Sequence, residues 1–536
     1  MKRWNGWGDD SITYPLHDAP RRFLQDLVGP GTPPQDADLT AVLRSVPATR
    51  LPMHPRVSPE PLGRLLHARG HSLPDWIDLR SGKIEAFPDG VAYPEEDVEV
   101  QELLRYAAEV GASVIPYGGG TSVVGHINAL ALGAPILTID LSRLNRMLRF
   151  DETSHLATFG AGVCGPDLEA HLRARGCTLG HYPQSFEYST LGGWIVTRSS
   201  GQQSLGYGRI ERLFAGGRLD SPAGTFVLPP FPASAAGPDL REVVLGSEGR
   251  LGILTQATVR VAPLPQREEF HGLFFRDFEH GQDALREIMQ ARLPLCMARL
   301  STAVETQTNL ALAGHERVIH ALEGLLSLRG AREDKCMLLL GCAGREGMVA
   351  ATVRQATAIA RAHGGVHVGQ TFGKQWHKSR FRTPYLRNTL WELGYAIDTL
   401  ETAVSWSAIP GLVGALEQAL RGGLEAVGER VHVFTHLSHL YPYGSSIYTT
   451  YLFRTASSGD READAAETLR RWRALKAAAS RVIVAHGGTI SHQHGIGTDH
   501  LAYLPDEKGP LGMAALADLC DRFDPQGIMN PGKLLL

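Results

Sequence analysis

The feature that most constrains the fold of this chain is a run of three glycines directly after a short apolar segment. The apolar segment runs from Ala112 to Ile115, and residues 116–122 then read PYGGGTS. We expect a buried strand followed by a tight loop, because apolar residues favour the first and glycines the second. Glycine has no Cβ, so backbone N–H groups in such a loop can approach an anion, for example a diphosphate, at close range.

The spacing of these glycines differs from the two common phosphate-binding loops. The chain has no G-x-x-x-x-G-K-[ST] motif, and no G-x-G-x-x-G motif opens a long helix directly after a strand. A tight turn without a ligand therefore stays an equal alternative when this segment is taken alone.

Two further segments rich in small residues follow the glycine loop. Residues 183–201 contain PQS, STLGGW and TRSSG, and residues 246–253 read GSEGRLGI just before an alternating strand pattern from Thr255 to Val261. Three such loops in this order, each beside an apolar strand, resemble the PCMH-type FAD-binding domain of the vanillyl-alcohol oxidase superfamily. The resemblance spans roughly residues 90 to 262.

This resemblance implies an FAD cofactor held by the three loops, with the glycine loop around its diphosphate. Covalent attachment in the superfamily often uses a histidine in that loop. The corresponding position here is Thr121, so we expect a dissociable FAD, although His126 lies only a few residues further on. The residues expected to contact the cofactor are Pro116, Tyr117, Gly118, Gly119, Gly120, Thr121, Ser122, Pro183, Ser185, Ser189, Thr190, Gly192, Gly193, Thr197, Ser199, Ser200, Glu248, Gly249, Gly252 and Ile253.

The composition indicates a globular cytoplasmic protein without a nucleic-acid partner. Of 536 residues 43% are hydrophobic and 20% are charged, and the formal net charge is −3. No apolar run reaches the roughly 18 residues that cross a bilayer, and no signal peptide is visible. The six cysteines show no C-x-x-C spacing, which is typical of a reduced protein without a zinc site.

The length predicts two or three domains, because one core rarely serves a chain of this size. We expect residues 1–89 to form an N-terminal extension and residues 90–265 a PCMH-type FAD-binding domain of two subdomains. Residues 266–500 predict an α/β cap domain with an antiparallel sheet, and residues 501–536 a segment that returns to the FAD-binding domain. The predicted fold class is α+β.

Histidines gather in the predicted cap domain. The loop SHQHGIG at residues 491–497 presents His492 and His494 between glycines, and the ordinary histidine pKa of about 6.5 suits proton transfer. A surface loop or a metal site is the alternative, since an extended backbone would place both imidazoles on one face. His436 and His439 are three residues apart, so on a strand they would face opposite ways, one buried and one exposed.

Tyr448 and Arg387 carry weaker signals. Tyr448 lies in a strand pattern from Ile447 to Leu452, where a tyrosine usually serves packing. Arg387 follows Tyr385 closely, and an arginine near aromatic residues more often forms a salt bridge than binds a substrate. The local pattern alone therefore assigns a function to neither residue.

Five segments together resemble the alkyldihydroxyacetonephosphate synthases. They are residues 3–9 (RWNGWGD), 181–201, 380–388, 401–406 and 491–497, so the resemblance covers nearly the whole chain. The first segment is the one least shared with other flavoproteins. The resemblance implies an FAD-dependent enzyme that exchanges the acyl chain of acyl-dihydroxyacetone phosphate for a fatty alcohol. Such a reaction forms the ether bond of ether lipids without net redox change, and it needs a cationic pocket for the phosphate.

The same resemblance implies roles for four residues. Tyr448 matches the catalytic tyrosine of the family, which acts as an acid or base. His492 and His494 match the first and third histidines of its Ser-His-His-His loop, and Arg387 matches an active-site arginine.

Two positions depart from the family pattern. Gln493 replaces the middle histidine of the loop, and His436 stands where the family has an active-site arginine. Because histidine is a weaker and pH-dependent cation, the phosphate or carboxylate contact at His436 stays open. We still count His436 among the candidate catalytic residues.

The alternative enzyme is an FAD-linked 2-hydroxyacid dehydrogenase or oxidase of the D-lactate or glycolate type. Its Glu-His-Gly-Ile-Gly loop often contributes to a divalent-metal site, but Gln493 removes the anionic ligand here. A third alternative is a flavin-binding subunit without catalysis, which the lack of an iron–sulfur cysteine cluster disfavours. The expected substrate is thus a lipid or a small acid. A lipid requires transient contact with a membrane surface, so the protein would be peripheral to the membrane, and we expect a homodimer.

Overall fold

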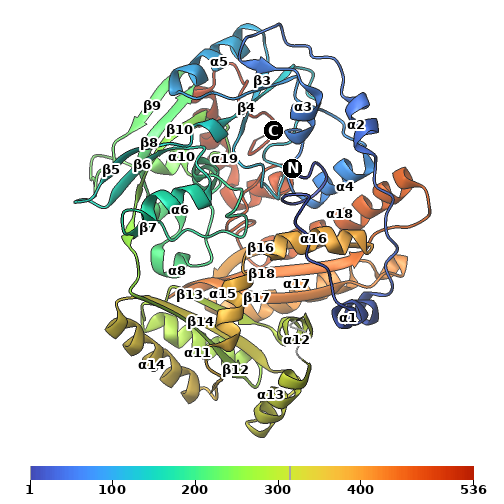
Figure 1. The fold of residues 1–536 in the computed structure, drawn as a ribbon, viewed down its shortest axis with the longest axis vertical. Helices are drawn as coiled ribbons and strands as arrows, with labels where there is room; N and C mark the ends of the chain where they lie inside the picture. Colours follow the sequence, from blue (N-terminus) through green and yellow to red (C-terminus); the bar gives the residue numbers. More distant parts are fainter. Residues whose placement is uncertain (1, 313–315, 536) are drawn as a thin grey trace.

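The computed structural model describes residues 2–312 and 316–535, which form two sheet-based halves with the chain ends near one of them (Figure 1). In the first half a small sheet has the strand order β1-β2-β4-β3. The strands β2, β4 and β3 are parallel, and β1 pairs with β2 in the antiparallel sense. Their bounds are β1 (Val57–Ser58), β2 (Gly90–Ala92), β3 (Ser113–Tyr117) and β4 (Ile136–Asp140). β3 is the strand expected before the glycine loop.

A second sheet of this half has five antiparallel strands in the order β5-β6-β10-β8-β9. They are β5 (Met147–Asp151), β6 (Leu156–Gly160), β8 (Phe214–Ser221), β9 (Gly224–Leu228) and β10 (Ile253–Arg260), with β7 (Cys177–Thr178) and β11 (Ala262–Pro263) forming a separate pair. Two sheets in this order confirm the expected two-subdomain FAD-binding domain.

The helices of this half are α2 (Leu39–Ser45), α3 (Pro61–Leu66), α4 (Leu73–Ser81), α5 (Asp97–Glu109), α6 (Gly165–Arg173), α7 (Leu191–Val196), α8 (Ser204–Tyr207), α9 (Ile210–Leu213) and α10 (Arg241–Val244). Of these, α4 and α8 pack against elements of the cap. The helix α5 instead packs within this half, since its buried Val100, Leu103 and Leu104 share one core with Val114 of β3. The apolar face of α5 thus packs against β3 and fixes the position at which the glycine loop begins.

The cap half is built on a seven-stranded sheet in the order β15-β12-β14-β13-β17-β18-β16. Every neighbouring pair is antiparallel, which confirms the predicted antiparallel cap. The strands are β12 (Arg267–Phe275), β13 (Met297–Ser301), β14 (Cys336–Gly344), β15 (Val366–His367), β16 (Tyr395–Ser405), β17 (His432–Tyr441) and β18 (Gly444–Arg454).

The cap helices pack around this sheet and around one another (Figure 1). They are α11 (Phe278–Gln290), α12 (Ala303–Leu312), α13 (Glu316–Leu328), α14 (Glu346–Ala362), α15 (Thr371–Ser379), α16 (Thr383–Glu392), α17 (Ile409–Gly422) and α18 (Arg461–Ala485). The largest core joins α11, α14, α17 and α18 to the strands through apolar side chains such as Leu285, Leu416 and Leu475.

The two ends of the chain tie the halves together. The helix α1 (Asp18–Val28) packs on α12 and β18 of the cap, whereas β1 joins the first sheet. At the other end α19 (Leu504–Phe523) precedes a segment whose Met529 forms a parallel bridge to Val114 of β3. The residues predicted as an extension therefore contact both domains, and the C-terminal segment returns to the FAD-binding domain.

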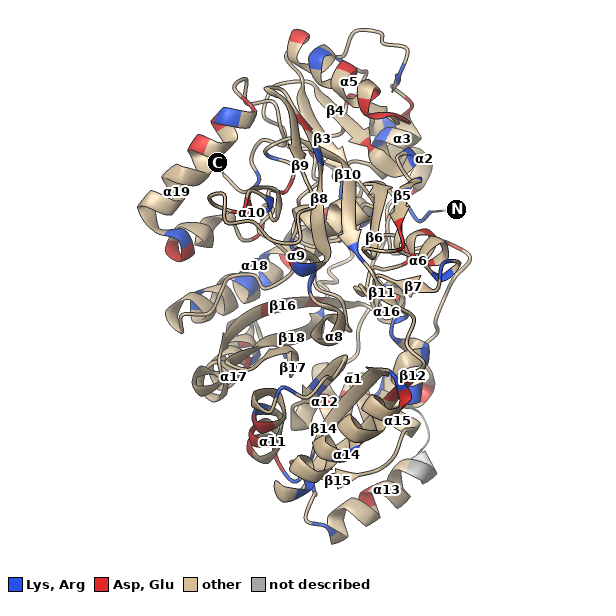
Figure 2. Ribbon diagram, turned by 90° about the vertical axis from the view of Figure 1, so that its left-hand side faces the viewer, with Lys and Arg blue, Asp and Glu red and all other residues tan. Residues whose placement is uncertain are grey.

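The surface carries mixed charge. Acidic and basic residues are interspersed along the helices of both halves (Figure 2). In the ranges that the structure describes, no helix is both long and apolar enough to cross a bilayer.

Candidate active site

The three predicted loops and four cap strands enclose one cavity of about 380 Å³. The FAD-binding domain contributes the glycine loop after β3 and the two later loops. The cap contributes residues of β13, β16, β17 and β18, together with the histidine loop at residues 491–497. The cavity thus lies where the two halves meet, which is the usual place for a ligand site between domains.

The glycine loop packs against the loop that follows residue 187. A Cβ added to Gly119 would lie 1.8 Å from the backbone oxygen of Tyr188, and one added to Gly118 would lie 2.3 Å from Thr190 Oγ1. The hydroxyl of Thr190 also caps the start of α7. Glycine is therefore required here for loop-to-loop contact, and this contact forms one wall of the cavity.

All but one of the residues expected to contact FAD line this cavity. The exception is Ile253, which begins β10 and packs in the core with Val114 and Met529. An apolar residue at the start of a central strand is drawn into the core instead of the ligand site.

His126 is buried and also lines the cavity. Its Nδ1 lies 2.9 Å from Ser122 Oγ, and its Nε2 lies 3.2 Å from a carboxylate oxygen of Glu248. The ring is wedged between these groups, so a bond to a flavin would require it to leave this position.

On the cap side the ring of Tyr448 lies between two histidines. His436 is its cross-strand partner on β17, and their rings stack with centroids 5.0 Å apart. His494 meets Tyr448 edge to face at 5.8 Å. Burial raises the pKa of Tyr448 to about 12 and lowers the pKa of His494 below its ordinary 6.5. At neutral pH the phenol keeps its proton and the imidazole of His494 is uncharged.

His436 is part of a buried charge cluster that the sequence did not reveal. Its Nδ1 lies 3.1 Å from Glu305 of α12, and Arg299 of β13 contacts both residues. Burial alone would raise the pKa of Glu305, but His436 and Arg299 together lower it to about 2. Arg299 lines the cavity, so it restores an arginine near the position where the family arginine is missing.

Arg387 of α16 also lines the cavity. Its guanidinium lies 4.5 Å from the ring of Trp76, and it donates one hydrogen bond to the backbone oxygen of His71. Its Nε and Nη2 atoms are buried without a hydrogen-bond partner in the described ranges. Unpaired buried N–H groups of a cation favour an anionic ligand.

Comparison with known proteins places the chain in a family. A model described as "FAD binding domain" matches residues 88–227, and one described as "FAD linked oxidases, C-terminal domain" matches residues 264–534. The alkyldihydroxyacetonephosphate synthase of Trypanosoma brucei brucei is 30% identical over 88% of this chain and 77% of its own length. This chain belongs to the alkyldihydroxyacetonephosphate synthase family of FAD-linked oxidases.

Other relatives support the same placement. The synthase of Dictyostelium discoideum is 29% identical over 99% of this chain and 93% of its own length. A solved alkyldihydroxyacetonephosphate synthase structure has a TM-score of 0.83 at 26% identity and covers 99% of this chain and 98% of that one. The mitochondrial D-lactate dehydrogenase of Arabidopsis thaliana is a more distant relative, 24% identical over 84% of this chain and 73% of its own length.

In this synthase-family chain His439 lines the cavity although the strand pattern predicted that His436 and His439 face opposite ways. That prediction is wrong because β17 has a bulge between Ser438 and Leu440, where His439 adopts a positive φ of 49°. A bulge inserts one residue and turns the following side chain. Nδ1 of His439 lies 3.0 Å from Ser200 Oγ of the flavin-domain loop.

His492 is buried but does not line the cavity, unlike the other predicted catalytic residues. Its Nε2 contacts Arg209 and lies 2.7 Å from the hydroxyl of Tyr441. Its ring stacks on His439 at 5.4 Å. His492 and His494 therefore contact different groups. His492 packs against His439 without reaching the cavity itself.

The N-terminal RWNGWGD motif also reaches the site. Trp7 lines the cavity and packs against His71 and Tyr188. Asn388 of α16 holds its backbone from both sides, accepting from the Trp7 N–H and donating to its carbonyl oxygen, each at 3.0 Å. This clamp explains why a motif at the chain end and the segment 380–388 belong together.

We expect Asn388→Ala to lower the free energy of unfolding by about 1–3 kcal/mol, because a buried N–H and a buried C=O lose their partner. Urea denaturation, followed by tryptophan fluorescence, would measure the change in the free energy of unfolding. Asn388→Asp would set a carboxylate oxygen against the Trp7 carbonyl oxygen, so it should lower the free energy of unfolding at least as much as Asn388→Ala. A value for Asn388→Ala within 0.3 kcal/mol of the unchanged protein, roughly the error of such a comparison, would contradict the clamp.

Proposed function

We propose that this protein is an FAD-dependent alkyldihydroxyacetonephosphate synthase, which exchanges the acyl chain of acyl-dihydroxyacetone phosphate for a fatty alcohol. The observation that carries the proposal is the group formed by Tyr448, His436 and His494 on the cap side of the cavity, opposite the loops expected to hold FAD. The family to which the chain belongs supports it.

The residues of the cavity fit an FAD cofactor. Small side chains and backbone line its flavin-domain side, and the carboxylate of Glu248 there is already engaged by backbone N–H groups. The glycine loop would hold the diphosphate. When bound, the flavin supplies a ring that can take up and release the substrate carbon without net redox change.

Tyr448 and His494 would move protons next to the ketone of the substrate. Neutral His494 can accept a proton from the carbon, and Tyr448, whose pKa is about 12, can donate one to a departing oxygen. Both groups are half-buried in the cavity wall, so a bound flavin and substrate would complete their shielding from water and hinder simple hydrolysis.

Arg387 and Arg299 would bind the phosphate. Among the residues that the structure describes, two nitrogens of Arg387 have no hydrogen-bond partner, whereas Arg299 forms an ion pair with Glu305. Arg387 is therefore the stronger anion ligand of the two, and His436 beside Glu305 is a positioning group for Arg299 and Tyr448.

The direct test is product analysis with purified, FAD-loaded protein. Palmitoyl-dihydroxyacetone phosphate and hexadecanol should yield the hexadecyl ether of dihydroxyacetone phosphate and free palmitate in equal amounts. Free palmitate without the ether product would indicate a hydrolase and overturn the proposal.

The pH dependence of the reaction should report His494. Because burial lowers its pKa below 6.5, a reaction that needs the neutral imidazole keeps its rate as the pH falls through 6.5 and loses it only below. A pH profile of kcat/KM measures this. An acidic limb at or above pH 6.5 would show that another group accepts the proton.

We further propose that the protein meets its lipid at a membrane surface and acts as a homodimer. Sedimentation with and without phospholipid vesicles would test the first point, and light scattering of the soluble protein the second. A monomer that never co-sediments with vesicles would contradict both.

A further inference from the structure

The histidine loop is held by two buried carboxylates, one from each domain. The loop runs from Ser491 to Gly497, with His500 just beyond it, and carries His494 at its centre. Glu401 of β16 approaches it from the cap, and Glu248 approaches it from the FAD-binding domain.

Glu401 accepts hydrogen bonds from four successive residues of the loop. Oε1 receives the hydroxyl of Ser491 at 2.8 Å and the backbone N–H of His494 at 2.9 Å. Its two oxygens also receive the backbone N–H groups of His492 and Gln493. Successive N–H groups that converge on one anion form a nest, so the carboxylate dictates the course of the backbone here.

The place of Glu401 in the sheet links this nest to the reacting side chains. On β16 it is the cross-strand partner of Tyr448 on β18. The side chain is only 1% exposed, and one oxygen lies 3.5 Å from His494 Nδ1. Among the described residues no lysine or arginine forms an ion pair with it. Its charge is therefore directed at the loop and at His494.

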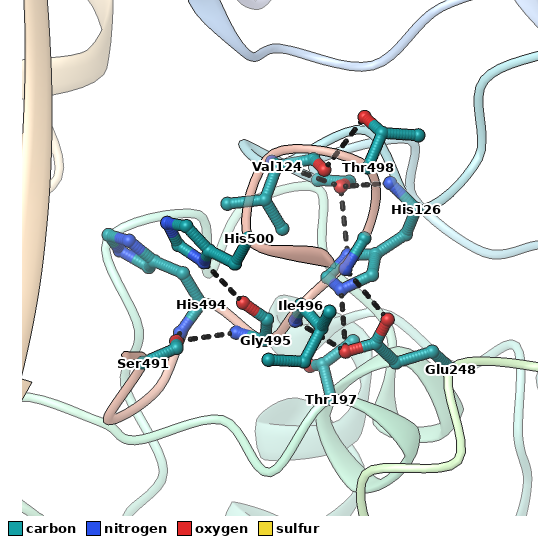
Figure 3. Close-up of polar contacts among 12 residues, drawn as sticks. Val124, His126, Thr197, Glu248, Ser491, His494, Gly495, Ile496, Thr498 and His500 are labelled. Atoms are coloured by element: carbon teal, nitrogen blue, oxygen red, sulfur yellow. Dashed lines mark hydrogen bonds and ion pairs between the residues drawn. The ribbon is translucent and has the colours of Figure 1, made fainter. Parts of the chain in front are cut away.

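Glu248 holds the second half of the loop. It accepts the N–H group of Ile496 at 2.6 Å, as Figure 3 shows, and the N–H group of Gly497 at 2.8 Å. A Cβ on Gly495, whose φ is +87°, would lie 2.7 Å from this carboxylate. His500 closes the turn from the other side with a contact of 2.8 Å to the oxygen of Gly495.

We propose that Glu401 is a positioning residue of the synthase site, which acts through the loop backbone to set the place and the charge of His494 against Tyr448. Glu248 anchors the same loop to the FAD-binding domain, so that the histidine keeps its place relative to the cofactor. This inference rests on the proposed proton transfer by His494. It adds two acidic residues to a site whose other candidates are histidine, tyrosine and arginine.

The test compares three variants of the FAD-loaded protein. Glu401→Gln keeps the size of the side chain but loses the charge and one acceptor. We expect kcat to fall roughly 10- to 100-fold with little change in KM, since a misplaced catalytic group costs about this much. Glu401→Asp keeps the charge and should recover part of the rate. Glu507→Gln is the matched control.

Glu507 is a suitable control because it holds the start of the same segment, away from the histidines. It accepts the hydroxyl of Thr489 and the N–H of Ile490, both at 2.9 Å. Glu507→Gln should at most lower the free energy of unfolding, and it should leave kcat unchanged. If both glutamine variants lose the same fraction of kcat, Glu401 has only a general structural role and the proposal fails.

A second readout does not depend on the substrate. The charged or titratable groups around His494 are Glu401, Asp398, Lys476, His126, His439, His492, His500 and Tyr448. Because the negative charge of Glu401 raises the pKa of His494, Glu401→Gln should lower that pKa, seen by NMR titration of labelled histidine. An unchanged pKa overturns the proposal even if the protein proves to have another activity.

A double variant distinguishes an effect of Glu401 on the position of His494 from a general loss of structure at the site. In a His494→Gln background the further change Glu401→Gln should have no added effect on kcat, because its target is already gone. Independent losses that multiply would show that Glu401 does not act through His494.

Discussion

Tyr448→Phe is expected to lower turnover roughly 10²- to 10⁴-fold while the protein keeps its yellow flavin, the range that a positioned acid or base contributes. The change removes only the hydroxyl, so the ring stays stacked on His436 and edge to face with His494. Turnover of acyl-dihydroxyacetone phosphate measures the loss of activity, and the flavin absorbance of the same sample shows whether the cofactor is retained. His494→Ala should have the same result.

Tyr451→Phe is the matched control on the same strand. Its hydroxyl donates to Asp398 at 3.1 Å, a carboxylate that also accepts from Trp472, and the Tyr451 side chain itself does not line the cavity. Stability should fall by about 1 kcal/mol, the worth of one buried hydrogen bond, with kcat unchanged. If Tyr448→Phe behaves like this control, Tyr448 is a packing residue and its catalytic role is wrong.

Gly119→Ala is expected to abolish FAD binding. The new methyl group would lie 1.8 Å from the backbone oxygen of Tyr188, and backbone cannot yield as a flexible side chain can. The two loops would separate, and the wall that they form around the cofactor would be lost. The ratio of flavin to protein absorbance after purification, and FAD titration by fluorescence, measure the effect.

Gly414→Ala provides the comparison. Gly414 lies in α17, and a Cβ there meets nothing within 4 Å. Alanine should therefore be neutral or stabilise the helix by up to about 1 kcal/mol, with FAD content unchanged. Full FAD content in Gly119→Ala would show that the glycine loop does not form this wall.

Long periodic elements and the loop order could be predicted from the sequence. The strand expected before the glycine loop is β3 (Ser113–Tyr117), and the alternating pattern from Thr255 to Val261 falls largely in β10 (Ile253–Arg260). The antiparallel cap is also confirmed, and the C-terminal segment forms a bridge from Met529 to Val114 of β3. Each of these features depends on the local pattern of residues, and that pattern can be read from a single sequence.

Features that depend on contacts between distant segments could not be predicted. The bulge that turns His439 into the cavity has no signal in its own strand. Glu305 and Arg299 meet His436 only because α12 and β13 lie beside β17. Glu401 had been noted only as part of a matching segment, because a nest of N–H groups forms in space and not in sequence order.

The direct test of the account is anaerobic mixing of the purified yellow protein with palmitoyl-dihydroxyacetone phosphate and hexadecanol, and separately with D-lactate and glycolate, while the flavin absorbance is followed. We expect exchange of the acyl chain for the alcohol with no lasting bleaching of the flavin, and an unchanged flavin spectrum with either hydroxy acid. Full bleaching by a hydroxy acid with no acyl exchange would contradict this expectation. That result would make the protein a dehydrogenase in which Arg387 binds a carboxylate.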